Sequence, residues 1–203
     1  MILYRIGHIF FRFIGALFHR LQVVHRERLI EEGPAFVVCN HVSFLDPPMV
    51  GASFRNPLHY LARKSLFIGP LKWILPAWNV VPVDRGKGDM ASLKRVLDLV
   101  KLGERVVLFP EGTRSPNGEL IQPEPGIGFL IAKSGAPVLP VRIFGTFEAY
   151  PRHAWFPRPG KVIVSVGQPI DFSTLPKDLT GRALYQAHAD KIMEAIGAIS
   201  KEG

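Results

Sequence analysis

The sequence predicts a single α/β domain with a mixed, mostly parallel β-sheet flanked by helices. Short runs of β-branched residues alternate with helical patterns along the chain, which is typical of strands joined by helical connections. These connections vary widely in length, and this favours a mixed sheet over a purely parallel one. With 203 residues, 47% of them hydrophobic, the chain is long enough to bury one core. We expect residues 21–203 to form that domain, preceded by a distinct helix over residues 1–20.

The individual elements follow from local patterns and punctuation. Seven strands are expected over residues 21–27, 35–39, 58–62, 79–83, 105–109, 138–144 and 161–166, where apolar runs end in turn residues. Helices are expected over residues 47–53, 64–77, 89–103, 126–133 and 180–199. Pro70 and Pro76 should break the second of these helices, and Asp89 should cap the third. No internal repeat or low-complexity tract interrupts this order.

The N-terminal segment 1–20 is the most apolar part of the chain. Arg5 and Arg12 interrupt it before it reaches the roughly 20 apolar residues that a membrane span needs, and Arg12 also disfavours a cleaved signal peptide. Helical spacing gathers basic side chains on one stripe, namely Arg5, His8, Arg12 and His19. It leaves a wide apolar face of Ile2, Leu3, Ile6, Ile9, Phe10, Phe13, Ile14 and Leu17. This pattern predicts an amphipathic helix in the membrane interface; packing on the domain's own core is the alternative.

The charge balance favours an anionic partner. Lys and Arg number 25 against 17 Asp and Glu, which gives a net charge of +8. The positive charges are scattered and no nucleic-acid-binding motif is present, so we expect an anionic membrane surface and no nucleic acid. A single cysteine excludes an internal disulfide and suits a reducing compartment.

Two segments carry the candidate chemistry, and both follow apolar strands. The first is NHVSFLD, in which His41 precedes Asp46 by five residues. An imidazole can act as a general base, and a carboxylate on its other ring nitrogen would fix the tautomer. The alternative is structural, because Asp46 followed by Pro47 also fits the start of a helix. Both roles are compatible, since a carboxylate at a helix start can orient a histidine one turn earlier.

Rival interpretations of the same segment are weaker. Cys39 lies two residues before His41, but its apolar neighbours favour a buried small residue over a nucleophile. Ser43 lacks the GxSxG surroundings of a nucleophile elbow. Further His or carboxylate side chains at ligand spacing are missing around His41, so no metal is expected.

The second segment is FPEGTRS, in which a glutamate and an arginine flank a Gly-Thr turn. Glu111, Gly112, Thr113 and Arg114 can direct a carboxylate, backbone N–H groups, a hydroxyl and a guanidinium at one polar ligand. A turn with a surface ion pair is the alternative. Asp84-Arg85, after another strand, adds a further arginine or a solvated charge pair.

In this order, NHVSFLD, VPVDRG, FPEGTRS and VLPV resemble the four blocks of the glycerolipid acyltransferase family, whose best-known member is 1-acylglycerol-3-phosphate acyltransferase. The resemblance covers about residues 20–170. It implies that His41 is the general base and Asp46 its orienting carboxylate. It also implies an acceptor-binding set of Arg85, Glu111, Gly112, Thr113 and Arg114. Asn40, Pro110 and Pro140 would be structural residues near the site, and Pro140 could also shape the acyl site.

The resemblance implies transfer of an acyl chain from acyl-CoA or acyl carrier protein to the hydroxyl of a lysophospholipid. The acceptor implied is 1-acylglycerol-3-phosphate, which would give phosphatidic acid. No cofactor is expected beyond the thioester co-substrate. The enzyme would sit at the cytoplasmic face of the cell membrane as a peripheral or monotopic protein.

One departure bears on the acceptor. Family members that use lysophosphatidic acid often carry Phe-Lys before a glycine after FPEGTRS, whereas this chain has Glu124 and Pro125 before Gly126. An anion near a phosphate site would weaken phosphate binding or indicate another headgroup. Alternatives to acyl transfer are a non-catalytic lipid-binding protein on the same scaffold and a transacylase or hydrolase that uses the same pair.

Overall fold

The computed structural model describes residues 2–84 and 90–202, which include a seven-stranded sheet in the order β1-β7-β6-β2-β5-β3-β4. All neighbouring strands are parallel except β6 and β7, which are antiparallel. The strands are β1 (Gln22–Val24), β2 (Ala35–Cys39), β3 (His59–Arg63), β4 (Val80–Val83), β5 (Arg105–Leu108), β6 (Val138–Phe144) and β7 (Ile163–Val166). The predicted mixed, mostly parallel α/β sheet is confirmed.

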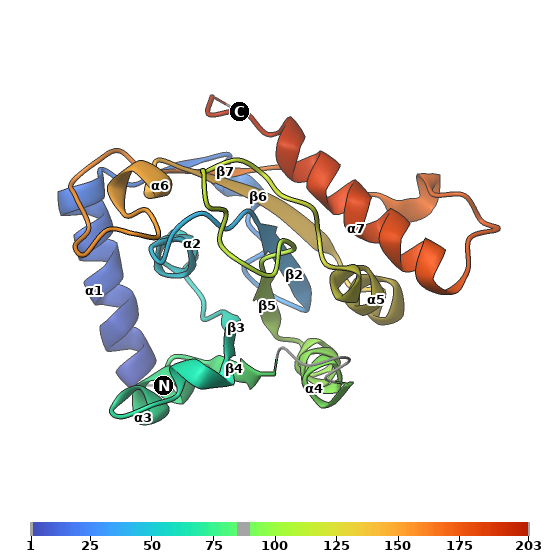
Figure 1. Ribbon diagram of the computed structural model, residues 1–203, viewed down its shortest axis with the longest axis horizontal. Coiled ribbons are helices and arrows are strands. Elements are labelled where there is room, and N and C mark those ends of the chain that lie inside the picture. The colour runs from blue at the N-terminus through green and yellow to red at the C-terminus, as the bar shows by residue number, and fades with distance from the viewer. Residues whose placement is uncertain (1, 85–89, 203) are drawn as a thin grey trace.

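Helices flank the sheet on both faces (Figure 1). They are α1 (Ile2–His19), α2 (Asp46–Ser53), α3 (Leu71–Ala77), α4 (Met90–Lys101), α5 (Pro125–Ser134), α6 (Thr146–Ala149) and α7 (Gly181–Ala198). Short 3-10 turns cover Arg26–Arg28, Lys64–Leu66 and Phe172–Thr174. The expected break at Pro70 is present, since α3 begins only after this residue, but Pro76 lies inside α3 and the expected break there is absent. The expected cap, Asp89, lies outside the described residues.

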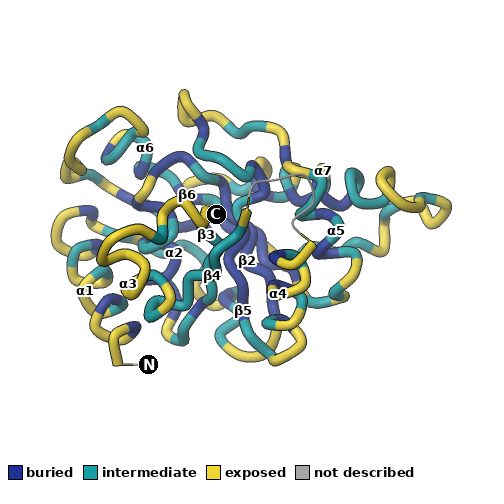
Figure 2. The backbone as a smooth tube through the Cα atoms, turned by 60° about the horizontal axis from the view of Figure 1, so that its bottom comes forward, coloured by how far each residue is buried: buried dark blue, intermediate teal, exposed yellow. Residues whose placement is uncertain are grey.

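Strand β2 shows how one sheet supports two cores. All five of its residues are buried, so it appears as a dark central strand in Figure 2. Val37 and Cys39 belong to the core shared with α2, whereas Phe36 and Val38 belong to the core shared with α4, α5 and α7. This alternation follows from the two-residue side-chain period of a strand. A strand that is buried on both faces needs a continuous apolar run, as AFVVC provides.

Strands β2 and β5 are parallel neighbours, which determines where the site lies. Val37 pairs with Val107 and Val38 with Leu108, so the two strands end at the same edge of the sheet. NHVSFLD follows β2 and FPEGTRS begins at the end of β5. The two segments, 70 residues apart in sequence, are therefore brought together at the carboxyl edge of the sheet.

Helix α1 packs on the domain with the side opposite to its widest apolar face. Gly7 and Gly15 allow close approach, and a Cβ atom at Gly7 would lie 2.8 Å from Nε1 of Trp78. The exposed large apolar side chains of α1 are Ile2, Leu3, Ile6, Ile9, Phe10, Phe13, Leu17 and Phe18. Most of the apolar face expected from sequence therefore points outward, although Ile14 is half-buried.

The expected basic stripe of α1 is divided in the structure. Arg5 and Arg12 are exposed, but Nε2–H of His8 donates a hydrogen bond to the carbonyl of Phe54, and His19 is buried. Helix α1 packs on the domain along one of its sides, and His8 and His19 lie at the border of that packed side. Among residues 2–84 and 90–202, no helix is long and apolar enough to cross a membrane. The interfacial role of α1 stays a prediction.

Candidate active site

His41 and Asp46 form a hydrogen-bonded pair at the carboxyl end of β2. Nδ1 of His41 lies 2.8 Å from Oδ2 of Asp46. The carboxylate is fully buried, whereas the imidazole side chain keeps 19% of its surface exposed. This arrangement makes Nδ1–H the donor to Asp46 and leaves Nε2 with a free lone pair, the tautomer that a general base requires.

Besides the bond to His41, Asp46 accepts hydrogen bonds from three other groups. Its Oδ2 accepts hydrogen bonds from the backbone N–H groups of Val42 and Ser43, each at 2.7 Å, and its Oδ1 accepts one from the hydroxyl of Thr146 at 2.6 Å. Asp46 begins α2 as expected, but its side chain bonds backwards to the preceding turn and does not cap the helix. These hydrogen bonds occupy both oxygens of the buried carboxylate and fix its orientation toward His41.

Backbone contacts tie the two sequence segments together. The N–H of His41 donates to Oε1 of Glu111 at 2.8 Å, and the N–H of Ser115 donates to the carbonyl of His41 at 2.8 Å. The ring of Phe109 stacks on the imidazole with 4.2 Å between ring centroids. These contacts fix the position of the histidine from both sides.

Glu111 is a buried carboxyl next to the pair. Burial raises its pKa to about 7, and the negative charge of Asp46 adds to the rise, while the hydrogen bond from the His41 N–H opposes it. Glu111 thus contacts the backbone of His41, and its carboxyl lies inside the protein, not on a surface turn.

Arg114 presents an unsatisfied guanidinium at the site. Its Cζ lies 3.5 Å from the ring centroid of Phe44, and its Nη1 is buried without a hydrogen-bond partner among the described residues. Burial lowers the pKa of Arg114, and the nearby charges of Arg152 and Arg63 lower it further. An anion bound here would satisfy Nη1 and relieve the repulsion between the three arginines.

The remaining residues expected at the site are Pro110, Gly112 and Thr113, which the structure describes, and Arg85, which it does not. Gly112 has φ +61°, and a Cβ there would lie 2.8 Å from Cγ of Glu124, so this turn requires glycine. The half-buried Thr113 follows in the same turn, and the carbonyl of Pro110 accepts the N–H of Glu124 at 2.8 Å. Arg85 lies outside the described residues.

The two predicted structural residues on or near the central strands have different surroundings. Asn40 joins β2 to β6, because its amide accepts from the N–H of Ile143 at 2.8 Å and donates to the carbonyl of the same residue at 3.1 Å. Pro140 pairs with Val38 inside the sheet and lines a cavity with Ser165, separate from the one next to His41.

The two rival nucleophiles are enclosed. Cys39 is fully buried, and burial raises the pKa of its thiol well above the ordinary range. The hydroxyl of Ser43 donates to the carbonyl of Tyr150 at 2.7 Å and accepts the N–H of Leu45. Neither side chain has the exposure of an attacking group, and His41 is the more accessible reactive side chain. No group of three or more potential metal ligands occurs among the described residues.

An apolar cavity of about 290 Å³ opens beside the pair. Phe44 and Phe109, which contact Arg114 and His41, line it together with residues of α1, α2, β3 and α3. Its lining also includes Phe11, Ala62 and Trp78. A hydrocarbon chain would fit such a lining, and its polar end would then lie at His41.

Several residues at the site give little sequence signal. Thr146 and Tyr150 follow β6 and are about 100 residues from Asp46, while Arg63 and Arg152 occur in no recognisable motif. The only available signal for Thr146 is its place just after a strand end, where α/β sheets build their sites.

Comparisons with known proteins identify the family of the chain. Residues 20–144 match the sequence model of the family described as Acyltransferase. The chain is 33% identical over 138 residues to a chloroplastic 1-acyl-sn-glycerol-3-phosphate acyltransferase of Brassica napus; the alignment covers 66% of this chain but only 40% of that protein. It is 28% identical over 181 residues to the 1-acyl-sn-glycerol-3-phosphate acyltransferase of Bacillus subtilis, covering 86% of this chain and 87% of that one.

A solved structure extends the similarity to the fold. The crystal structure of the 1-acyl-sn-glycerophosphate (LPA) acyltransferase of Thermotoga maritima superposes with a TM-score of 0.78 at 25% identity, covering 96% of this chain and 78% of that one. The family model matches more than half of the residues, and the chain therefore belongs to the acyltransferase family.

Proposed function

We propose that this protein is an O-acyltransferase that moves a fatty acyl chain from a thioester to the free hydroxyl of a lysophospholipid. The observation that carries the proposal is the buried Asp46 carboxylate, which is 2.8 Å from Nδ1 of a partly exposed His41 and beside an apolar cavity. The relatives are named 1-acyl-sn-glycerol-3-phosphate acyltransferases, and this makes 1-acylglycerol-3-phosphate the preferred acceptor and phosphatidic acid the product.

In this mechanism Nε2 of His41 takes the proton of the acceptor hydroxyl as its oxygen attacks the thioester carbonyl. Asp46 stabilises the imidazolium that forms and keeps the ring in place. The tetrahedral intermediate then collapses, the C–S bond breaks, and the imidazolium returns its proton to the leaving thiolate. The products are an ester and a free thiol. No covalent intermediate on the protein and no cofactor are needed.

Binding energy away from the reacting atoms would align the substrates. The free Nη1 of Arg114 is suited to the acceptor phosphate, with Arg63 and Arg152 adding to the positive field. Arg85 lies outside the described residues, so its part in this set is proposed from the sequence. The apolar cavity would hold an acyl chain next to the base.

The exposed apolar side of α1 supports attachment to a membrane. Seven of its large apolar side chains are more than half exposed, and Arg5 and Arg12 flank them. Such a helix would lie in an anionic interface without crossing it, as a peripheral or monotopic contact. The cytoplasmic face is the side where acyl-CoA and acyl carrier protein would be available as donors.

The experiment is release of free thiol from acyl-CoA and from acyl carrier protein, with lysophosphatidic acid or other lysolipids, by wild type, His41→Ala and His41→Gln. We expect turnover that depends on an acceptor and falls by at least about 100-fold in both His41 variants. His59→Gln is the matched control, because His59 is also half-buried but pairs with Glu104. Thiol release without an acceptor would indicate a hydrolase, and lipid binding without turnover would indicate a non-catalytic protein.

A further inference from the structure

The loop of residues 151–160 exposes two aromatic side chains. Trp155 is 90% exposed and Phe156 is 78% exposed. Aromatic side chains of this size usually bury most of their surface in a folded protein. Two adjacent exposed aromatic residues therefore mark this loop as a contact surface.

Hydrogen bonds define the shape of the 151–160 loop. The N–H of Arg158 donates to the carbonyl of Ala149 at 2.7 Å and closes the loop at its base. Within the loop, the N–H of Ala154 donates to the carbonyl of Pro151 at 3.0 Å. The loop therefore projects from a base that is closed by a hydrogen bond.

The loop connects the candidate active site to α1. It begins after Tyr150, whose carbonyl accepts the Ser43 hydroxyl and whose ring centroid lies 6.1 Å from that of Phe44. It ends at Gly160, whose N–H donates to the carbonyl of Phe18 at 3.1 Å. One end thus contacts the turn between His41 and Asp46, and the other contacts the last turn of α1.

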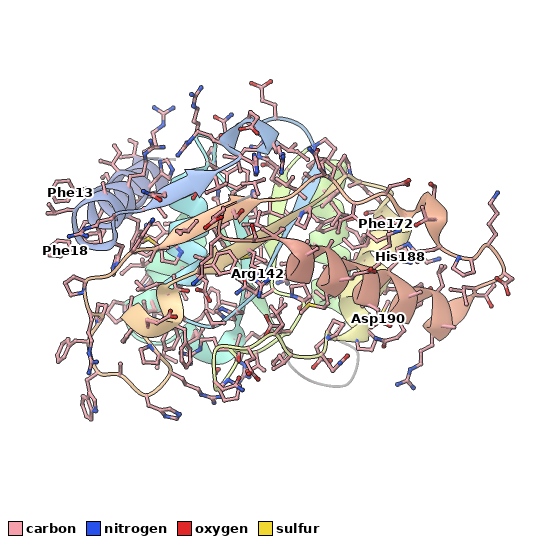
Figure 3. The ribbon with its side chains drawn as sticks, turned by 90° about the horizontal axis from the view of Figure 1, so that it is seen from above. Phe13, Phe18, Arg142, Phe172, His188 and Asp190 are labelled. Carbon is pink, nitrogen blue, oxygen red and sulfur yellow. The ribbon has the colours of Figure 1, made fainter. Side chains whose placement is uncertain are left out.

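The exposed apolar surfaces of the loop and of α1 lie at the same end of the molecule. Figure 1 shows the segment after α6 running beside α1, and Figure 3 shows the same segment near the end of the molecule where Phe13 and Phe18 project. Phe13 is 61% exposed and Phe18 is 46% exposed. Trp155 and Phe156 therefore extend the apolar surface of α1 and do not form an isolated patch.

The charges around the loop favour an anionic partner. Residues 151–161 contain Arg152, His153, Arg158 and Lys161 and no acidic residue. Arg158 and Lys161 also line a surface cavity with Lys201, where Glu148 is the one acidic side chain among the lining residues described. Aromatic rings with basic residues on either side are suited to the headgroup region of an anionic bilayer, which takes both apolar and cationic groups.

We propose that the 151–160 loop is a second membrane contact, which inserts Trp155 and Phe156 at the headgroup level of an anionic bilayer beside α1. Two contacts orient a protein on a surface, whereas one helix leaves it free to roll about the helix axis. Because the loop begins next to Phe44, this orientation would bring the opening at His41 to the lipid surface. The inference extends the proposed function but concerns binding, so it can be tested without turnover.

Fluorescence of Trp155 provides the direct test. In a Trp73→Phe, Trp78→Phe variant of the full chain, Trp155 is the single tryptophan. We expect a blue shift and strong quenching with brominated phosphatidylglycerol vesicles, and little change with phosphatidylcholine vesicles. If replacing Trp78 disturbs folding, the difference between wild type and Trp155→Phe gives the same signal. If the wavelength and intensity of Trp155 emission do not change with brominated anionic vesicles, the proposal is overturned.

Vesicle partitioning provides the second test. We expect Trp155→Ser, Phe156→Ser to weaken binding to phosphatidylglycerol vesicles by about tenfold or more, since two large side chains no longer bury apolar surface. The matched control is Leu102→Ser, because Leu102 is 78% exposed but follows α4 on another part of the molecule. Equal partitioning of the double variant and wild type would contradict the loop contact. Lipid-free self-association that the double variant abolishes would instead assign the loop to a second copy.

Activity assays separate this inference from the proposed function. With a short-chain acceptor dissolved in water, the double variant should turn over like wild type, because neither residue contacts His41 or Asp46. With the acceptor in anionic vesicles its rate should fall along with its binding. Wild-type protein that is inactive with every acceptor would contradict the proposed function. The fluorescence and partitioning results would still show whether the loop contacts the membrane.

Discussion

The hydroxyl of Thr146 donates a 2.6 Å hydrogen bond to Oδ1 of Asp46, across 100 residues of sequence. Oδ2 of the same carboxylate already serves His41 and two backbone N–H groups. Thr146 itself is fully buried in the first turn of α6. One short helix after β6 thus fixes the rotation of the carboxylate that orients the histidine.

Replacing Thr146 should therefore affect catalysis through Asp46. We expect Thr146→Val to lower kcat by about tenfold with little change in KM, and to cost about 1–3 kcal/mol of unfolding free energy, because a buried carboxylate oxygen loses its donor. Thr146→Ser keeps the hydroxyl and should restore most of kcat. Equal kcat values for the Val and Ser variants would show that Asp46 does not need this bond.

Glu111 should make stability depend on pH. Burial raises the pKa of its carboxyl from an ordinary value of 4.5 to about 7 in the folded protein. Between these values the folded state keeps a proton that the unfolded chain releases, so this contribution is complete below about pH 4.5 and is lost as pH rises through about 7.

The Glu111→Gln variant tests this dependence. Gln cannot titrate, but its side-chain oxygen can still accept the His41 N–H. The unfolding free energy of the variant relative to wild type should therefore rise by about 1–3 kcal/mol between about pH 5 and pH 8. Urea denaturation at both pH values measures it, with the exposed Glu119→Gln as control. A difference that stays constant with pH would mean that Glu111 titrates normally.

The turn at Gly112 should tolerate no side chain. Its φ of +61° is unfavourable for other residues, and a Cβ would press on Glu124. We expect Gly112→Ala to cost about 1–2 kcal/mol. Gly126→Ala is the control, because its Cβ would meet nothing within 4 Å at the start of α5, where alanine should be neutral or slightly stabilising. Thermal unfolding that is unchanged by Gly112→Ala would contradict this account.

Glu124 should reduce affinity for a phosphate acceptor. Its side chain packs against Gly112, so a negative group lies at the turn that carries Arg114. Removing this charge in Glu124→Gln should lower KM for lysophosphatidic acid by about two- to fivefold and leave KM for a lysolipid without net charge unchanged. An equal change for both acceptors would show that Glu124 acts on packing and not on charge.

Local patterns were sufficient for the strands and for the two reactive segments. The apolar, β-branched runs AFVVC and RVVLF indicate buried strands. Because parallel neighbours end at the same edge of a sheet, His41 and Glu111 could be expected to lie close together. Thr146 could not be found this way, because its role depends on how β6 registers against β2. For α1 the sequence favoured an outward apolar face but left packing on the core open, and the close fit of Gly7 against Trp78 shows which side of the helix docks on the domain.

The apolar cavity should determine which acyl chains are accepted. Ala62 is a small side chain on β3 in the cavity wall, and Phe11 and Trp78 also line the cavity. A larger residue at 62 would occupy space that a long hydrocarbon chain needs, while a short chain would still leave its carbonyl beside His41. We expect Ala62→Phe to reduce the rate with long-chain thioesters by about tenfold or more and to change the short-chain rate little. The short-chain rate is the internal control for folding and for the His41–Asp46 pair. A loss that is equal for both chain lengths would mean that the cavity does not hold the acyl chain during transfer.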